Sequence, residues 1–409
     1  MTTPLAIINA QIIDPVAGTV SDGGILIRDR FIAAVGTFDI PEGCETIDAK
    51  RAYVAPGLVD LGSFAIDMRA FSAGGITRAA LMPDQSPPLD HAALVQRASA
   101  AGKPDVWIHP IAAATKGLLG TDLGEIGLMQ AAGACAVATG REWIADSGVM
   151  YRLLSYARAL DLVVISHAED GGLTAEAVAT DGEMATRLGL ASAPAIAEAM
   201  AVARDLALAA QTGAHIHFRQ ITTAAAIDLI RAAKKAGTRV SCGISPAHFL
   251  LSDVAIGGFR TFARLSPPLR CEDDRKAAIA GIADGTIDLI CSSHDPQGPE
   301  AKRLPYADAE AGMAGAETLL TLALVLVRDG AIDLPGMIAK LSTTPARLLG
   351  VPGGTLNVGD EADLIMFDPD LPWRIDSDKM AGSAGNTPFD GLPVQGKVLR
   401  TIKGGVPVG

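Results

Sequence analysis

Residues 54–64 read Val-Ala-Pro-Gly-Leu-Val-Asp-Leu-Gly-Ser-Phe, and this stretch decides the fold. Its apolar run indicates a buried strand that ends at Gly62-Ser63-Phe64. Further apolar runs follow it and alternate with amphipathic helical segments in a repeating βα rhythm. The eight predicted strands are Gly57–Leu61, Ile76–Met82, Val106–Ala112, Ala134–Ala138, Leu162–His167, His215–Ile221, Val240–Ile244 and Ile287–Ser292.

Helical segments connect these strands. They are predicted over Val149–Leu160, Pro194–Ala210, Thr223–Lys235, Arg275–Ala283 and Glu317–Arg328. Eight strands with intervening helices are the number that a closed, TIM-like (β/α)8 barrel needs. In such barrels the chemistry lies at the carboxyl ends of the strands. Candidate site residues are therefore those at or just past a strand end.

Both ends of the chain differ from this middle part. Short strand-like pieces fill residues 5–49, and the same pattern returns in Ala362–Asp368, Leu392–Leu399 and Thr401–Val408. We therefore expect an α/β protein in two parts. Residues 1–54 and 350–409 are predicted to form a small composite β-sandwich, and residues 55–349 the barrel.

Composition and charge exclude several classes of function. The net charge of −12 and the lack of a Lys/Arg cluster argue against nucleic acid as a partner. The most apolar helical stretch, Leu319–Val327, is far shorter than the about 20 residues of a membrane helix. The N-terminus lacks the basic start of a signal peptide. Five scattered cysteines without CxxC spacing are typical of reduced thiols, so we expect a cytoplasmic protein.

Several phrases, in this order and spacing, carry a resemblance to a known family. They are Ala55–Asp60, Ala73–Gly75, Ala114–Gly117, Asp146–Met150, Ser166–Asp170, Pro267–Arg270, Gly285–Asp288, Ala311–Thr318, Thr344–Arg347 and Asn386–Gly391. Along nearly its whole length the chain resembles bacterial dihydroorotases of the amidohydrolase superfamily. The resemblance implies a zinc-dependent cyclic amide hydrolase of pyrimidine biosynthesis. That chemistry needs a metal to lower the pKa of a bound water to about 7, and a carboxylate base.

The resemblance also implies where the metal ligands stand, and the first positions depart from the family. The first strand of the family ends in His-x-His, and here those positions are Gly62 and Phe64, which carry no lone pair for a metal. Asp84 replaces the asparagine of a Met-Pro-Asn phrase, so a negative group stands where an anionic substrate would bind. Thr139 lies where the fourth strand supplies a carbamylated lysine or an aspartate.

The remaining positions keep one ligand. The fifth strand retains His167, whereas the sixth carries Gln220 in place of a histidine. His217 lies three residues earlier, and strand alternation predicts that it turns away from the pocket. The catalytic aspartate of the family corresponds to Ser293, with Asp295 two residues on, in the expected loop. One imidazole cannot hold a catalytic zinc, which takes three or more protein ligands.

We therefore predict a non-catalytic dihydroorotase homologue, with a vestigial pocket, no metal and no cofactor. The resemblance implies a partner, because non-catalytic relatives exist beside aspartate carbamoyltransferase, the preceding enzyme of the pathway. The predicted role is that of a structural or assembly partner of this transferase, within a homo- or hetero-oligomer.

Two alternatives stay open. The first is an active zinc-dependent dihydroorotase, or a related cyclic amidohydrolase, with atypical ligands. A site rebuilt from His167, His215, His217 and Asp295 would serve, but several loops would have to be re-aimed. The second is a small-molecule-binding pseudoenzyme that uses the emptied pocket.

Overall fold

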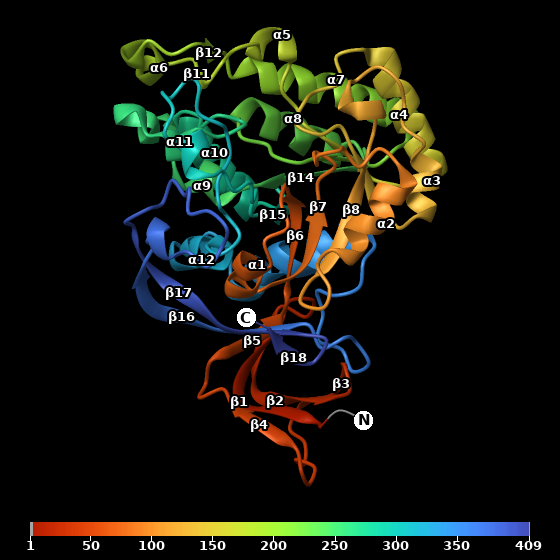
Figure 1. The fold of residues 1–409 in the computed structure, drawn as a ribbon, viewed down its shortest axis with the longest axis vertical. Coiled ribbons are helices and arrows are strands. Elements are labelled where there is room, and N and C mark those ends of the chain that lie inside the picture. The colour runs from red at the N-terminus through yellow and green to blue at the C-terminus, as the bar shows by residue number, and fades with distance from the viewer. Residues whose placement is uncertain (1–2, 409) are drawn as a thin grey trace.

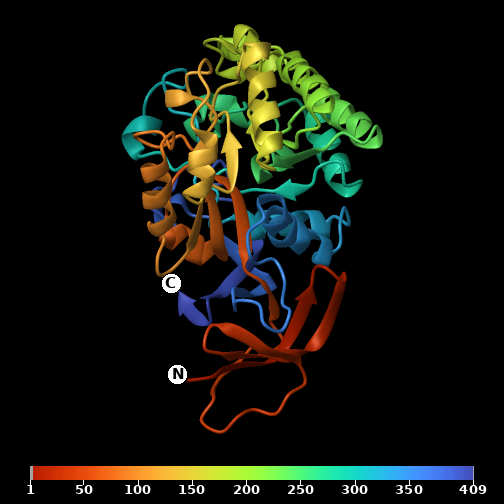
Figure 2. The same ribbon diagram turned by 90° about the vertical axis from the view of Figure 1, so that its right-hand side faces the viewer.

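Figure 1 shows the computed structural model, which describes residues 3–408. Helices and parallel strands form its upper part, and strands from both ends of the chain form a second sheet below. Figure 2 shows the same two parts from the side, with the red N-terminal strands beneath the barrel. The site described below lies in the upper part.

The upper part is built around an eight-stranded sheet in which each strand pairs in parallel with its neighbours. Its strands, in spatial order, are β6 (Leu58–Ser63), β7 (Ile76–Leu81), β8 (Trp107–Ala113), β9 (Ala136–Ala138), β10 (Val164–Ser166), β13 (Ile216–Phe218), β14 (Val240–Ile244) and β15 (Leu289–Ile290). Each one overlaps a strand predicted from the sequence. The predicted TIM-like α/β architecture is therefore confirmed.

Hydrogen bonds join the first and last strands of this sheet. The backbone N–H of Phe64 donates to the carbonyl of His294 over 2.8 Å. The N–H and hydroxyl of Ser292 donate to the carboxylate of Asp60 over 2.7 and 2.5 Å. Burial raises the pKa of Asp60, and the two Ser292 donors oppose that rise. These bonds hold the ends of β6 and β15 together and close the ring of strands.

Helices surround the strands. The main ones are α1 (Met68–Gly74), α2 (Ala92–Ala100), α3 (Ile126–Ala131), α4 (Ser147–Ala159), α7 (Ile196–Thr212), α8 (Ala224–Lys235), α10 (Glu272–Ala283), α12 (Leu319–Arg328), α13 (Leu334–Ile338) and α14 (Thr344–Leu349). Side-chain caps fix where some of them begin: Asp146 accepts from Val149 N–H at the start of α4, and Thr223 caps α8. Within residues 3–408, no helix is long and apolar enough to cross a membrane.

Shorter elements cover the upper end of the barrel. They are α5 (Gly171–Thr174), α6 (Glu183–Leu188), α9 (Pro246–Leu250), α11 (Pro299–Lys302) and the small two-stranded sheet of β11 (Ala179–Thr180) and β12 (Ser192–Ala193). Figure 1 shows α5, α6 and this small sheet above the carboxyl ends of the barrel strands.

The second sheet joins both ends of the chain, as predicted. Its strands are β1 (Leu5–Asp14), β2 (Thr19–Arg28), β3 (Phe31–Gly36), β4 (Glu45–Asp48), β5 (Tyr53–Pro56), β16 (Leu364–Arg374), β17 (Pro393–Lys403) and β18 (Val406–Val408). β5 makes the connection, because it pairs in parallel with β1 and antiparallel with β16. β5 also spans residues 54 and 55, and the predicted division into domains at that point stays a prediction.

One predicted break within this sheet was wrong. One strand was predicted to end at Leu399 and another to begin at Thr401, but β17 runs without interruption to Lys403. The chain turns instead at Gly404 and Gly405, whose φ angles of 55° and 80° are readily adopted by glycine.

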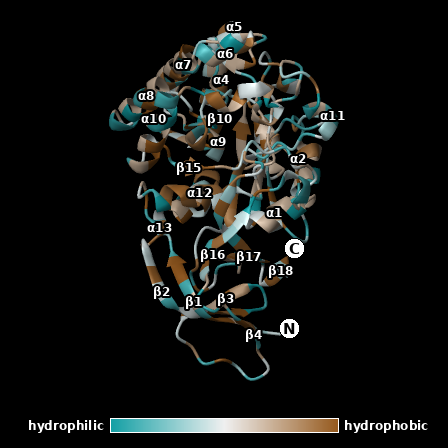
Figure 3. Ribbon diagram, turned by 90° about the vertical axis from the view of Figure 1, so that its left-hand side faces the viewer, coloured by the Kyte–Doolittle hydropathy of each residue, from teal (hydrophilic) through white to brown (hydrophobic). Residues whose placement is uncertain are grey.

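Apolar side chains fill the barrel below its upper end. Leu61, Ile111, Ile165 and Leu289 belong to one buried cluster inside the ring of strands. A second and larger cluster lies between the strands and the outer helices. Figure 3 shows the contrast, with hydrophobic strands inside and more hydrophilic helices around them. We call the layer above Leu61 and Ile165 the barrel mouth.

Candidate site at the barrel mouth

Gly62, in β6, and Phe64, directly after β6, lie at the barrel mouth. Gly62 has a φ of 105°, which disfavours any residue with a Cβ. A Cβ placed there would lie 3.7 Å from Cγ and Cδ of Arg219. The side chain of Arg219, from the loop after β13, thus occupies the space toward which the end of β6 points.

Phe64 forms the floor of two cation–π contacts. The guanidinium of Arg141 lies over its ring at 3.9 Å from the centroid, and that of Arg219 at 5.0 Å. Gln85 fixes the backbone below, since its Nε2 donates to the Phe64 carbonyl over 3.0 Å. We call Phe64, Arg141, Arg219, Gln220 and Ser293 the central cluster.

Arg219 is a buried cation, with 2% of its surface exposed. Its Nη2 donates to Nδ1 of His167 over 3.2 Å, and its Nε has no hydrogen-bond partner. Within residues 3–408, no ion pair joins it to a carboxylate. Burial lowers the pKa of Arg219, although the negative charges of Asp84 and Asp295 oppose that shift.

His167 has both ring nitrogens engaged. Nδ1 accepts from Arg219, so a neutral ring carries its proton on Nε2, which lies 3.6 Å from Oε2 of Glu169. Its backbone N–H donates to Oγ1 of Thr139 over 3.0 Å. The Thr139 hydroxyl therefore accepts a hydrogen bond from the backbone that follows the neighbouring strand.

Gln220 and Ser293 meet each other across the mouth. Nε2 of Gln220 donates to Oγ of Ser293, while its buried Oε1 has no partner. Ser293 has a φ of 47°, and its hydroxyl lies 3.8 Å from the thiol of Cys291. Burial raises the pKa of that thiol to about 12, so Cys291 is a neutral thiol at neutral pH.

Two acidic side chains border the central cluster. Oδ1 of Asp84 accepts from the backbone N–H of Arg141 over 2.9 Å. Burial raises the pKa of Asp84, and the positive charges of Arg141 and Arg219 oppose that rise. Asp295 binds Nη1 of Arg141 over 2.5 Å. Both carboxylates thus engage Arg141, which leaves Arg219 to its contact with His167.

Three other histidines lie away from the mouth. Ring nitrogens of His215 and His217 lie 3.2 and 2.9 Å from the hydroxyl of Ser241, on the body of the barrel. His294 is buried on the side of α1, where its Nδ1 accepts from the N–H of Ala316. Burial lowers the pKa of His294 to about 4 and that of His217 to about 3. The structure therefore does not bring His167, His215, His217 and Asp295 together.

The stated reason for excluding His217 was wrong. Alternation was expected to turn it to the opposite face from Gln220. β13 ends at Phe218, however, so alternation stops there, and both Arg219 and Gln220 line the mouth. His217 pairs in register with Ile165, whose side chain belongs to the cluster inside the ring of strands, so His217 also faces inward but lies deeper in the barrel. Depth, and not direction, keeps it from the mouth.

These residues do not fit a zinc ion. The surviving imidazole of His167 gives its Nδ1 lone pair to a guanidinium, and a second cation beside that guanidinium would be repelled. Among residues 3–408, no group of three His, Cys, Asp or Glu side chains is placed to hold a metal ion.

Beside the central cluster lies a second polar group, which we call the Arg270 cluster. Arg270 is buried, and its Nη2 binds Oε1 of Glu169 over 2.6 Å and approaches Oε2 of Glu198 at 3.5 Å. The Glu198 carboxylate also accepts from the backbone and hydroxyl groups of Thr222 and Thr223. Burial raises the pKa of Glu169, but bonds from His167 and Arg270 outweigh it and lower that pKa to about 2.

A small hollow remains above the central cluster. Its volume is about 20 Å³, and its lining includes Arg219, Gln220, His248 and Ser293. The loop 311–313 borders it from outside, and Lys302 fixes this loop by donating to the carbonyl of Glu310 over 2.5 Å.

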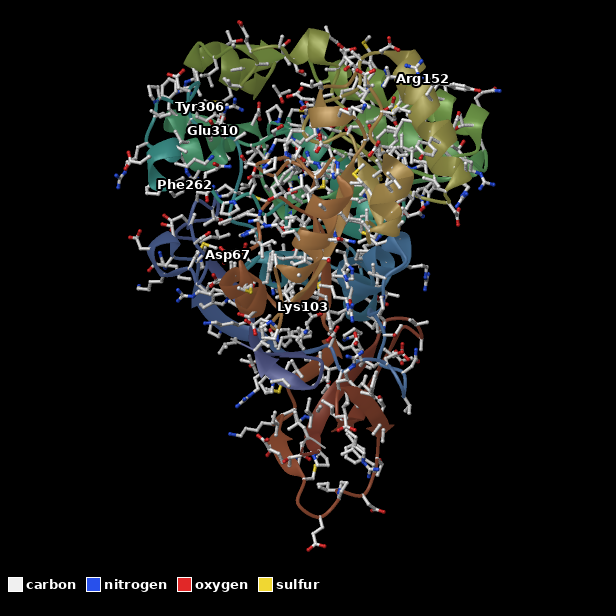
Figure 4. The ribbon with its side chains drawn as sticks, turned by 45° about the vertical axis from the view of Figure 1, so that its right-hand side comes forward. Asp67, Lys103, Arg152, Phe262, Tyr306 and Glu310 are labelled. Atoms are coloured by element: carbon white, nitrogen blue, oxygen red, sulfur yellow. The ribbon has the colours of Figure 1, made fainter. Side chains whose placement is uncertain are left out.

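Figure 4 labels Phe262, Tyr306 and Glu310, which lie near one another at the upper end of the barrel. Lys302 holds these segments together, since it also donates to the carbonyls of Thr261 and Arg264. Asp67 lies lower, beside α1.

Sequence reasoning missed Arg141, Arg219 and Arg270 as members of the mouth. A feature of the sequence could have identified two of these arginines. Arg141 and Arg219 each follow a buried strand by three residues or fewer, which is where barrel side chains reach the mouth. Which partners they would take depends on the loops, and the sequence pattern does not specify those contacts.

The chain matches the amidohydrolase family over residues 67–408. It is 39% identical over 417 residues to a protein named dihydroorotase from Syntrophotalea carbinolica, with 98% of each chain covered. A dihydroorotase from Pelotomaculum thermopropionicum is also 39% identical over 415 residues, with 98% of this chain and 97% of that protein covered.

Solved structures share the fold. L-hydantoinase (dihydropyrimidinase) from Arthrobacter aurescens matches with a TM-score of 0.88 at 24% identity, covering 100% of this chain and 96% of that one. Dihydropyrimidinase from Brevibacillus agri NCHU1002 matches with a TM-score of 0.85 at 21% identity, covering 99% and 95%. At these identities the likeness shows the fold alone.

Proposed function

The chain belongs to the amidohydrolase family, among the homologues of the dihydroorotases, and from this premise we propose that it is a non-catalytic member. The observation that carries the proposal is the position of Arg219. A guanidinium stands against His167, the only metal ligand type that the sequence analysis found at the family positions. Hydrolysis of a cyclic amide needs an activated water and a carboxylate base. Gly62, Phe64 and Ser293 supply neither.

We further propose that the chain acts in pyrimidine biosynthesis as an assembly partner of aspartate carbamoyltransferase. The relatives named dihydroorotase are matched over 97–98% of their length, so the whole scaffold is present. A scaffold of this size with its chemistry replaced fits a structural role in an oligomer. We place this role in the cytoplasm, a location that its five free cysteines favour.

Association with the transferase can be measured directly. The two full-length proteins from one organism are co-expressed, with a tag on this chain only, and the eluate is analysed by size-exclusion chromatography with light scattering. The proposal expects one particle that contains both chains and is larger than either protein alone. Separate elution of the two proteins at micromolar concentration would contradict it. A curated dihydroorotase relative, tagged in the same way, controls for capture by the barrel fold in general.

An active enzyme is the second candidate, and the 39% identity to proteins named dihydroorotase favours it. It requires ligands that rearrange on metal binding. The protein, purified with zinc in the medium, is tested for ring opening of dihydroorotate and for ring closure of carbamoyl aspartate. Turnover that a chelator abolishes and zinc restores would establish this candidate and overturn the first one.

A further inference from the structure

Arg219 differs from the other deeply buried arginines in its lack of a counter-ion. Arg270 binds Glu169, and Arg78 binds Glu361 and Asp363 over 2.5 and 2.7 Å. Arg219 is as buried as these two, yet its only polar partner in residues 3–408 is the neutral acceptor on His167. A buried charge is strongly destabilising unless an opposite charge or a full set of hydrogen bonds compensates it.

The nearby acids do not provide that compensation. Asp295 gives one carboxylate oxygen to Arg141 and the other to Gln297. Asp84 gives Oδ1 to the Arg141 backbone, and its Oδ2 has no partner. The charges of both arginines act on Asp84, but within residues 3–408 it forms no ion pair with Arg219.

The hollow above the central cluster has the size of one small group. Its volume of about 20 Å³ exceeds the about 10–15 Å³ that a single water needs, by a narrow margin. Arg141, Arg219 and Asp295 line it, and the carboxylate of Asp84 lies near both arginines. Ser245, Ser293 and His248 add polar atoms to the lining.

Gln220, which lines the hollow, also has an unused hydrogen-bonding atom. Its Oε1 is buried without a partner, while Nε2 contacts Ser293. A serine hydroxyl can both donate and accept a hydrogen bond. Rotating the side-chain amide of Gln220 by half a turn therefore keeps a hydrogen bond with Ser293. The NH2 group then becomes a free donor, and Arg219, whose Nε also lacks a partner, lines the same hollow.

We propose that the hollow binds one small monovalent anion of halide size, held by the guanidinium of Arg219 and the amide of Gln220. The anion supplies the counter-charge that Arg219 lacks. This site is independent of the proposed partnership with the transferase, because it concerns the charge balance of the barrel alone.

The first test is thermal unfolding of the full chain at constant ionic strength. Sodium gluconate is replaced stepwise by sodium bromide or chloride. A bound halide predicts a saturating rise in the unfolding midpoint of about 1–2 °C, because a ligand that binds only the folded state stabilises it. Arg219→Met removes this rise. Arg204→Met is the matched control: this half-buried arginine pairs with Asp205 outside the hollow, and its loss leaves the halide response in place.

Anomalous diffraction from crystals grown in bromide locates the ion. The proposal expects a peak within hydrogen-bond distance of Arg219 in wild-type crystals and its absence in Arg219→Met. No peak at the hollow and no halide-dependent shift would overturn the proposal. A midpoint that rises with formate but not with bromide would also overturn it, since the site would then be one for a carboxylate group.

Discussion

The central cluster and the Arg270 cluster lie side by side at one barrel mouth and differ in how their charges are balanced. In the Arg270 cluster a buried guanidinium meets Glu169, and the second acid, Glu198, receives bonds from two threonines. In the central cluster the guanidinium of Arg219 stacks on Phe64 and meets a neutral imidazole. His167 connects the two clusters, with one nitrogen toward each.

The difference separates the supporting part of the mouth from its chemical part. Glu169 and Arg270 belong to phrases that match the dihydroorotases, and they tie the loop after β10 to the loop before α10. Gly62, Phe64, Gln220 and Ser293 occupy positions where the resemblance places ligands or a base. The supporting network is therefore fully paired, whereas the centre holds an arginine without a carboxylate partner against an aromatic ring.

The largest effect is expected from breaking the paired cluster. Arg270→Met leaves Glu169 and Glu198 buried without their cation, and removal of one member of a buried ion pair costs about 3–5 kcal/mol. The free energy of unfolding, measured with urea, should fall by this amount. Arg303→Ala, at an exposed ion pair with Glu300, is the control and should cause no measurable loss. A small effect of Arg270→Met would show that the cluster does not support the mouth.

The contributions of the Arg270 cluster and of the buried histidines to stability depend differently on pH. His294 has a folded pKa of about 4, below its ordinary 6.5, so the unfolded chain takes up the proton first. Its contribution is lost as pH falls from 6.5 to 4, and amounts to about 3 kcal/mol. The pKa of Glu169 is about 2, below its ordinary 4.5, so its contribution persists above pH 4.5.

Urea unfolding between pH 7 and pH 4.5 checks this assignment. His294→Gln should reduce the decline in stability across that window, to which the lowered pKa of His217 also contributes, whereas Glu169→Gln should lower stability throughout the window without changing the slope. Equal slopes in wild type and His294→Gln would refute the role of His294.

Arg219→Met sharpens the contrast with Arg270→Met. The methionine keeps the apolar contact with Phe64 and removes a buried charge that lacks a carboxylate partner. In gluconate buffer we expect the free energy of unfolding to stay within about 1 kcal/mol of wild type, or to rise. A loss as large as that of Arg270→Met would mean that Arg219 has a strong partner, and the two clusters would then be alike.

Much of the fold followed from the sequence, and the reasons are physical. Strands such as Val240–Ile244 are short apolar runs between helices of clear 3.6-residue periodicity, and their order in a barrel follows from the chain. The predicted break at residue 400 was misplaced, because the positive φ angles that turn the chain lie at Gly404 and Gly405.

The site was less predictable. The positions of Gly62, Phe64 and Gln220 at the mouth could be anticipated from strand ends. That Arg219 would fill the space beside Gly62 could not, because it depends on where β13 stops and how its loop bends. Pairings such as Arg270 with Glu169 join residues far apart in the chain and leave no local pattern.

The smallest effect is expected at the edge of the centre. Arg141 is 40% exposed at its side chain, so its ion pair with Asp295 is screened by solvent. Asp295→Asn should lower the free energy of unfolding by about 0.2–1 kcal/mol. A larger loss would place Asp295 among the groups that hold the mouth together, and would make it a further counter-charge for the arginines.

One measurement tests the central claim most directly: the zinc content of the purified protein, determined together with its rate of dihydroorotate ring opening. The account predicts zinc far below one ion per chain and a rate no higher than that of buffer, in wild type and in Arg219→Met alike. Stoichiometric zinc with chelator-sensitive turnover would contradict it.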